Sequence, residues 1–340
     1  MKIIVDAFGG DNAPLEVLKG CRMAVDRLDV DIILTGDNEK ITDCARQNNV
    51  NLDRMKIVHT SEVFDIHEEP SKIIKTGKNT SMALGLKLLH DGEGDAFLSA
   101  GSTGGLVVGA TMIAKRIKGI KRVALAPIMP ADKGSFILLD AGANTDCRPE
   151  MLVQFAIMGS AYMEKVMGIQ KPKVALVNIG AEETKGRELE IEAFGKLREC
   201  GVNFTGNIEA RDIPNGDAQV IITDGYTGNV LLKLYEGMGK FFSRKLKGMF
   251  SGFVGKLSAA LIISKIKDFK KQMDYKEVGG AVLLGVSRPV IKAHGSSDAN
   301  AFFNAVRQAK KCVDGRVVEE ITAAVSSDSG RETTPNNGES

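Results

Sequence analysis

The sequence lacks several features that would assign it to a familiar class at once. Its 340 residues carry a formal net charge of only +2, so the chain as a whole shows no signal for a polyanionic partner such as nucleic acid. No stretch reaches the length of about 18 uninterrupted apolar residues that indicates a transmembrane helix. The five cysteines are scattered without a C-x-x-C spacing, so neither a disulfide framework nor a zinc site is expected and the thiols are predicted to be reduced and cytosolic.

The remaining composition is that of a globular chain, with 43% apolar and 26% charged residues. The length allows two domains or one large α/β unit. The first residues, "MKIIVDAFGG", contain an apolar run too short for a signal peptide, and we expect a first strand there. The last residues, "SSDSGRETTPNNGES", are polar and aperiodic, which predicts a disordered tail over residues 326–340 after a single domain over residues 1–325.

Short apolar runs rich in β-branched residues alternate with longer segments of helical periodicity. Runs that are apolar throughout indicate strands buried on both faces, and this favours a mostly parallel sheet between two helical layers. We therefore predict a three-layer α/β/α fold. The expected strands lie within residues 2–7, 30–36, 55–60, 95–100, 135–141, 172–180 and 218–225.

Glycine and small polar residues gather where these strands are expected to end. Two of the strand ends repeat a Gly-x-Thr-Gly pattern, "SAGSTGG" at residues 99–105 and "TDGYTGN" at residues 223–229. Neither is followed by the G-K-[ST] of a Walker A loop, and neither has the G-x-G-x-x-G spacing of a dinucleotide turn. Either pattern alone could be a chain turn that binds no ligand. Because ligands of open α/β sheets bind at the carboxyl ends of strands, the repetition favours an anion site.

Eight motifs, in this order, resemble those of bacterial phosphate acyltransferases of the PlsX type. The resemblance covers residues 1 to about 320. It implies an α/β/α chain related in fold to phosphotransacetylases and isocitrate-dehydrogenase-like enzymes. It also implies a homodimer that transfers a fatty acyl group from acyl carrier protein to inorganic phosphate, giving acyl phosphate for phospholipid synthesis. The motifs are "VDAFGGDNAP", "SAGSTGGL", "RIKGIKRVALAP", "LLDAGAN", "NIGAEETKGREL", "GNIEARDI", "TDGYTGNVLLK" and "VIKAHGSSDANA".

Such a reaction suits a chain without a visible Ser-His-Asp triad, because phosphate itself attacks the thioester. The site must supply an anion cradle, a cation and donors for the developing oxyanion, while a metal is optional and no cofactor is expected. Lys185 is the first candidate for the cation and Arg187 the second, with a solvated lysine as the alternative. Residues expected to bind substrate are Gly101, Ser102, Thr103, Gly104, Asn178, Asp224, Gly225, Thr227, Gly228 and Ser296.

The candidates for catalytic residues are Lys185, Asn229 and His294. Four of the candidate side chains leave two interpretations open. Asn229 could cap a helix or donate to the oxyanion. Asp224 could orient the lysine or cap the same helix. His294 could be structural or act as the acid for the departing thiol. Ser296, together with Ser297 and Asp298, could cap the next helix or help to form an anion seat at its N-terminus.

Residues 240–276 form the basic part of the chain, with ten Lys and Arg residues around an apolar centre. We expect a helical arm there that protrudes from the domain. A dimer-interface or core helix is one interpretation. Peripheral membrane contact through Leu257, Leu261, Ile262 and Lys265 is a second, and docking of an acidic carrier protein is a third. The segment lacks a nucleic-acid-binding motif.

Two rival functions remain beside the acyl carrier protein reaction. The first is a phosphotransacetylase-like enzyme that uses acyl-CoA. The second is a non-catalytic membrane scaffold of lipid synthesis. For the acyl carrier protein reaction itself we expect a cytoplasmic enzyme at the inner face of the membrane, with a membrane acyltransferase acting downstream as a candidate partner. A dehydrogenase is opposed by the absence of a dinucleotide fingerprint.

Overall fold

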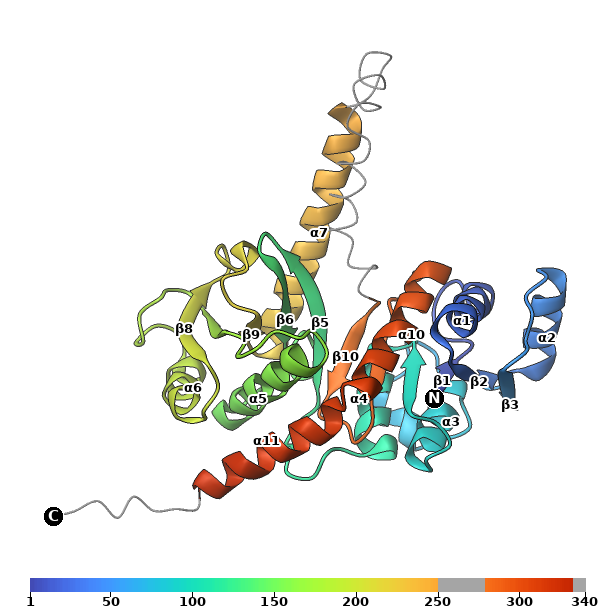
Figure 1. Cartoon of the computed structure of the whole chain (residues 1–340), viewed down its shortest axis with the longest axis horizontal. Coiled ribbons are helices and arrows are strands. Elements are labelled where there is room, and N and C mark those ends of the chain that lie inside the picture. Colours follow the sequence, from blue (N-terminus) through green and yellow to red (C-terminus); the bar gives the residue numbers. More distant parts are fainter. Residues whose placement is uncertain (250–278, 333–340) are drawn as a thin grey trace.

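A computed structural model describes residues 1–249 and 279–332 of the chain (Figure 1). Its strands form one eleven-stranded sheet in the order β3-β2-β1-β4-β11-β10-β5-β6-β9-β7-β8. The pairs β11-β10, β10-β5 and β5-β6 are antiparallel and the other seven are parallel, so the predicted mostly parallel sheet is confirmed. The strands are β1 (Lys2–Asp6), β2 (Asp31–Gly36), β3 (Met55–His59), β4 (Ala96–Ser99), β5 (Ala124–Ala131), β6 (Gly134–Leu139), β7 (Val174–Asn178), β8 (Phe204–Glu209), β9 (Val220–Ile222), β10 (Ala281–Leu284) and β11 (Val290–Lys292).

Helices cover both faces of this sheet. Alternate strand residues point to opposite faces: Ile3 and Val5 belong to one core cluster and Ile4 to the other. The first cluster includes residues of α1, α5, α10 and α11, and the second includes residues of α3 and α4, which gives the predicted three layers. The helices are α1 (Leu15–Leu28), α2 (Asn38–Gln47), α3 (Ser81–His90), α4 (Thr103–Gly109), α5 (Pro149–Lys165), α6 (Glu188–Glu199), α7 (Gly225–Met249), α10 (Ala299–Asp314) and α11 (Val317–Glu332), with the short helices η1 (Pro70–Ile74), η2 (Ala110–Ala114) and η3 (Ile213–Asn215).

The parallel strands place their carboxyl ends in two groups. β1, β4 and β11 are parallel neighbours, so their ends meet at one edge of the sheet. β6, β9 and β7 are also parallel neighbours and form the second group. The antiparallel strands β10 and β5 lie between the two groups. Because three antiparallel pairs separate them, the strands of the two groups run in opposite directions. β10 pairs with the first half of β5 and β6 with its second half, so the carboxyl ends of both groups, and with them the two Gly-x-Thr-Gly turns after β4 and β9, meet near the middle of β5.

The predicted helical arm begins earlier than residue 240. α7 starts at Gly225 and runs without a break to Met249, and it projects away from the sheet (Figure 1). The predicted membrane-binding residues Leu257, Leu261, Ile262 and Lys265 lie outside the described residues. No helix in residues 1–249 or 279–332 combines the length and the apolar character needed to cross a bilayer.

The C-terminal end of the fold also differs from the prediction. α11 continues to Glu332, beyond the predicted start of a disordered tail at residue 326. Val317, Ile321 and Val325 recur at helical spacing and are buried in the core, so the helix is anchored as far as Val325. The remainder of the predicted tail, residues 333–340, lies outside the described residues.

Candidate functional site

A cavity of about 580 Å³ lies between the two groups of strand ends. The first group contributes Thr103 and Gly104, which follow β4, and His294, which follows β11. The second group contributes residues 141–143, which follow β6, and Asn229 from the first turn of α7. Four predicted site residues from three separate segments of the chain therefore line one cavity, which we call the anion cavity.

The anion cavity also holds a cation that the sequence analysis missed. Lys292, the last residue of β11, donates from Nζ to the carbonyl oxygens of Ala100 at 3.3 Å and of Ala293. Burial lowers the pKa of the Lys292 ammonium to about 8, although the charges of Asp11 and Asp6 oppose this shift. An ammonium has three donors, so one is left for a ligand beyond the two carbonyls. The signal in the sequence was a single lysine at the end of the apolar run "PVIKA".

Lys292 also borders a second cavity of about 790 Å³ on the other side of the first glycine turn. Asp11, Gly101 and Ser102 line this second cavity, and Thr103 and Gly104 line both. The first glycine turn is therefore a wall between two open spaces.

Buried polar side chains hold the first glycine turn in place. The Asp6 carboxylate, at the end of β1, accepts hydrogen bonds from Ser81 Oγ at 2.6 Å and from Ser99 Oγ at 2.7 Å. The Gly101 N–H donates to Ser99 Oγ at 3.0 Å, and Ser102 Oγ caps α4 by accepting from the Gly105 N–H at 3.3 Å. Burial raises the pKa of the Asp6 carboxyl, although these hydrogen bonds oppose the shift. The turn is thus part of a rigid network and not a loose loop.

The second glycine turn has a different environment. The Gly225 N–H donates to the carbonyl oxygen of Asn144 at 2.7 Å. A Cβ atom added at Gly225 would lie 2.4 Å from that oxygen, and one added at Gly228 would lie 1.9 Å from the carbonyl oxygen of Asp140. Both glycines let the first turn of α7 pack directly on the loop after β6, and neither lines the anion cavity. Of this turn, only Asn229 reaches the cavity.

Asp140 holds the loop on which α7 packs. Its carboxylate accepts hydrogen bonds from the backbone N–H groups of Leu125, Gly142, Ala143 and Asn144, at 2.6 to 3.1 Å. Burial raises its pKa in spite of these bonds. Asp140 therefore shapes residues 141–143 of the cavity wall.

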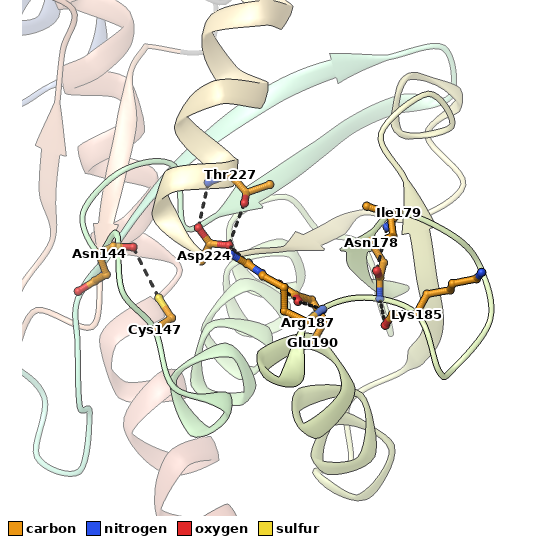
Figure 2. Close-up of polar contacts among 9 residues, drawn as sticks. All are labelled: Asn144, Cys147, Asn178, Ile179, Lys185, Arg187, Glu190, Asp224 and Thr227. Atoms are coloured by element: carbon orange, nitrogen blue, oxygen red, sulfur yellow. Dashed lines mark hydrogen bonds and ion pairs between the residues drawn. The ribbon is translucent and has the colours of Figure 1, made fainter.

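Asp224 caps α7 and pairs with an arginine (Figure 2). Its carboxylate accepts from the Thr227 N–H at 2.9 Å, from Thr227 Oγ1 at 2.8 Å and from Arg187 Nη2 at 2.7 Å. The same guanidinium pairs with Glu190. Burial opposes the ionisation of Asp224, but the bonds from Thr227 and Arg187 outweigh it, and the pKa lies below its ordinary value. The helix-cap interpretation of Asp224 is confirmed, and the cation that Asp224 holds is Arg187 instead of a lysine.

Lys185 and Asn178 do not lie at the anion cavity. The Lys185 side chain is exposed and lies over Gly180, and Figure 2 shows it pointing away from Arg187 and Asp224. Asn178 accepts from the Ile179 N–H at 2.8 Å and donates from Nδ2 to the Lys185 carbonyl oxygen at 2.9 Å. In the described structure Asn178 therefore fixes the loop after β7, because its side chain is engaged by the backbone of that loop.

His294 lines the anion cavity, whereas Ser296 does not. The Nδ1 atom of His294 lies 2.9 Å from Ser296 Oγ and 3.2 Å from the Ser296 nitrogen. Of the three residues expected to offer a cap for α10, Asp298 is the one that caps it, because its carboxylate accepts from the Ala301 N–H at 2.9 Å. Through these contacts with Nδ1, Ser296 orients the imidazole of His294.

The chemistry of the anion cavity suits an anionic ligand next to a carbonyl group. Lys292, His294, Asn229 and Thr103 line it and carry an ammonium, an imidazole, a side-chain amide and a hydroxyl. Lys233 and Glu236 line it as well, and their charges are opposite in sign. Within the described part of the chain, no group of three His, Cys, Asp or Glu side chains could hold a metal ion. The five cysteines are free, and burial raises the pKa of the Cys147 thiol, which contacts the carbonyl oxygen of Asn144, to about 11.

Comparison with solved structures confirms the fold. A phosphotransacetylase from Streptococcus pyogenes superposes with a TM-score of 0.63 at 18% identity, covering 94% of this chain and 94% of that chain. A putative 4-hydroxythreonine-4-phosphate dehydrogenase from Salmonella typhimurium superposes with a TM-score of 0.50 at 10% identity, covering 92% of this chain and 98% of that one. At these identities the likeness concerns the fold alone.

Sequence comparison is more specific. A family model described as "Fatty acid synthesis protein" matches residues 1–320. The phosphate acyltransferase of Caldanaerobacter subterraneus subsp. tengcongensis is 48% identical over 323 residues, which are 94% of this chain and 96% of that protein. The phosphate acyltransferase of Alkaliphilus oremlandii is 48% identical over 328 residues, 96% of this chain and 98% of that protein. The chain therefore belongs to the phosphate acyltransferase family and is an acyltransferase.

Proposed function

We propose that this enzyme transfers a fatty acyl group from acyl carrier protein to inorganic phosphate and releases acyl phosphate for glycerophospholipid synthesis. One observation carries the proposal: the anion cavity joins Lys292, Thr103, Asn229 and His294 from separate strand ends. The relatives are called phosphate acyltransferases, a name in which phosphate is the acceptor of the acyl group. The anion cavity offers the cation and the hydrogen-bond donors that a bound phosphate needs.

In the proposed reaction a phosphate oxygen attacks the thioester carbonyl carbon directly. A carbon–oxygen bond forms, the carbonyl becomes an oxyanion, and the carbon–sulfur bond then breaks to release the carrier thiolate. Lys292 and the hydroxyl of Thr103 hold the phosphate, and the amide of Asn229 donates to the oxyanion. His294 protonates the thiolate or contacts the substrate. No covalent acyl-enzyme forms.

The proposal assigns the cation to Lys292 in place of Lys185. Lys292 lies in the anion cavity, whereas Lys185 lies on an exposed loop outside it. Asp224 and Thr227, with Gly225 and Gly228, then serve to position the first turn of α7 and its Asn229, because their contacts are with each other and with the loop after β6. Gly101 and Ser102 shape the first turn. They bind the phosphate from the side of the turn that borders the second cavity.

We also propose a cytoplasmic homodimer that contacts the inner face of the membrane and an acyltransferase acting downstream there. α7 supports this part of the proposal, because several large apolar side chains on it are exposed, including Leu234 at 60% and Phe242 at 50%. An apolar surface of this kind is typical of protein or membrane contact.

The direct test incubates the enzyme with hexadecanoyl-acyl carrier protein and phosphate and traps acyl phosphate with hydroxylamine as the hydroxamate. We expect phosphate-dependent hydroxamate and no turnover of acetyl-CoA. Turnover of acetyl-CoA without turnover of the carrier-bound substrate would establish the phosphotransacetylase-like alternative. Absence of both reactions, with lipid synthesis in cells lost only on deletion of residues 240–276, would establish the scaffold.

A further inference from the structure

An apolar cavity, distinct from the second cavity beside the first glycine turn, lies between α7 and the β5–β6 hairpin. Its volume is about 380 Å³, and its walls include Phe136, Leu138, Leu231, Tyr235 and Met238. The Tyr235 hydroxyl donates to the carbonyl oxygen of Pro130 at 2.5 Å, and its ring packs edge-on against Phe136 with centroids 5.9 Å apart. The wall is therefore built on a strand pair and a helix that are tied together, and we call this space the apolar cavity.

The apolar cavity adjoins the anion cavity. Met129 on β5 and Leu232 on α7 line both spaces. Leu232 is three residues from Asn229, so the two side chains lie on the same face of α7, one helical turn apart. A ligand whose polar end lies against Asn229 therefore meets apolar walls one turn further along the helix.

We infer that the apolar cavity holds the acyl chain of the thioester while its carbonyl lies beside Asn229 in the anion cavity. This inference rests on the proposed function and deepens it, because it assigns a place to the apolar part of the substrate. A linear molecule with a polar head and a long apolar tail is the ligand class that fits a polar cavity joined to an apolar one. Each methylene buried there stabilises the complex by about 0.8 kcal/mol.

Gly239 offers a way to shorten the apolar cavity. It lines the cavity seven residues after Leu232, and seven residues of helix span about 10 Å. An extended chain advances roughly 1.2 Å per single bond, so roughly eight bonds separate the level of Leu232 from that of Gly239. A Cβ atom added at Gly239 meets no atom within 4 Å. Phe242, one turn further along α7, also lines the cavity, so a leucine at position 239 can fill part of its length without moving the backbone.

Gly237 provides a matched control. It lies on the same helix, a Cβ atom added there also meets no atom within 4 Å, and it does not line the apolar cavity. Gly237→Leu and Gly239→Leu make the same change in side chain and in helix propensity. They differ only in whether the leucine enters the cavity.

The experiment compares hexadecanoyl- and hexanoyl-acyl carrier protein as donors for the wild type and both variants. We expect Gly239→Leu to lower the ratio of the two kcat/KM values by about 10- to 50-fold, equivalent to two or three buried methylenes. The same variant weakens the binding of free hexadecanoate, measured by calorimetry, to a similar degree. Gly237→Leu leaves both measurements within twofold of the wild type.

Equal donor ratios and equal hexadecanoate affinities in the two variants would overturn the inference. A change in sedimentation coefficient for Gly239→Leu, without a change in either measurement, would instead identify the cavity as an interface between two copies of the chain. Failure of the proposed function is separate, because it would remove phosphate-dependent hydroxamate from the wild type with every donor, while hexadecanoate binding would still test the apolar cavity.

Discussion

The two Gly-x-Thr-Gly turns are nearly the same in sequence and differ in what their glycines do. The first turn, residues 99–105, separates two cavities, and Thr103 and Gly104 line both of them. The second turn, residues 223–229, is closed, because Gly225 and Gly228 pack against the carbonyl oxygens of the loop after β6. One turn is part of a binding surface and the other is a packing contact.

The difference shows that a glycine-rich strand end has two physical meanings. Glycine allows backbone to approach a ligand, and it equally allows backbone to approach backbone. In the second turn the close approach serves to place Asn229, which is the residue that reaches the anion cavity. The two turns thus lie on opposite sides of one site but contribute to it in different ways.

The largest effect is expected from the packing glycine of the second turn. Gly228→Ala places a Cβ atom 1.9 Å from the Asp140 carbonyl oxygen, so the start of α7 must move. We expect the free energy of unfolding in urea to fall by about 4 kcal/mol or more. Gly237→Ala on the same helix, where the new Cβ meets no atom within 4 Å, is expected to stabilise by up to about 1 kcal/mol. Equal stability of the two variants would contradict the packing role.

Removal of the Lys292 ammonium, which lies beside the first glycine turn, should abolish most of the activity. Lys292→Met is expected to lower kcat/KM for phosphate by about 10²- to 10³-fold, the usual effect of deleting one donor at such a site. Lys185→Met, on the exposed loop, is expected to change it by less than about threefold. Initial rates at varied phosphate concentration decide between the two lysines. The reverse order of effects would return the role to Lys185.

The protonation state of Lys292 predicts that kcat/KM for phosphate depends on pH. Its pKa is lowered to about 8, so the ammonium is lost above that pH, and kcat/KM for phosphate should fall by about tenfold per pH unit in the free enzyme. Lys292→Arg keeps its charge across this range, and its profile should stay flat between pH 8 and 9.5, whatever its absolute rate. A wild-type profile that is flat to pH 9.5 would exclude Lys292 as the phosphate-binding cation.

The smallest effect concerns the ion pair that supports the second turn. Arg187→Leu leaves the buried Asp224 carboxylate without its guanidinium, and since the arginine is largely exposed we expect a loss of about 1 kcal/mol at pH 7. The pKa of Asp224 is lowered in the folded state, so this contribution is present above about pH 4 and is lost as the pH falls through the folded-state value. Thermal unfolding at pH 7 and pH 3 measures it. Arg198→Leu, which breaks an exposed pair with Glu183, should cost less and serves as the control.

Strands with an uninterrupted apolar run could be predicted, whereas β5, β8, β10 and β11 could not. β8, "FTGNIE", has no apolar run and no buried residue. β5 contains Pro127 and Pro130, and proline argues against a central strand because it lacks a backbone donor. β10 and β11 are only four and three residues long and carry little periodicity. Their assignment depends on neighbours that are distant in sequence, since β11 pairs with β4 and β10 with β5.

The site shows the same division between local and distant information. Asn229 and His294 could be selected from the sequence because each stands beside a glycine-containing turn. Lys292 could not, because its neighbours in "PVIKA" predict an ordinary strand and only the parallel pairing of β11 with β4 brings its ammonium to the Ala100 carbonyl. Lys185 had the stronger local context, but the loop after β7 turns its side chain toward solvent.

By itself the sequence determined the α/β class, the mostly parallel sheet, the positions of the polar strand ends and membership of the family, because apolar periodicity and motif order are local properties of the chain. The tertiary structure alone decided which polar residues share a cavity, which glycines face a ligand and which face backbone, and which lysine is buried. These depend on strand order, and the order of the eleven strands is set by packing between segments that are far apart in sequence.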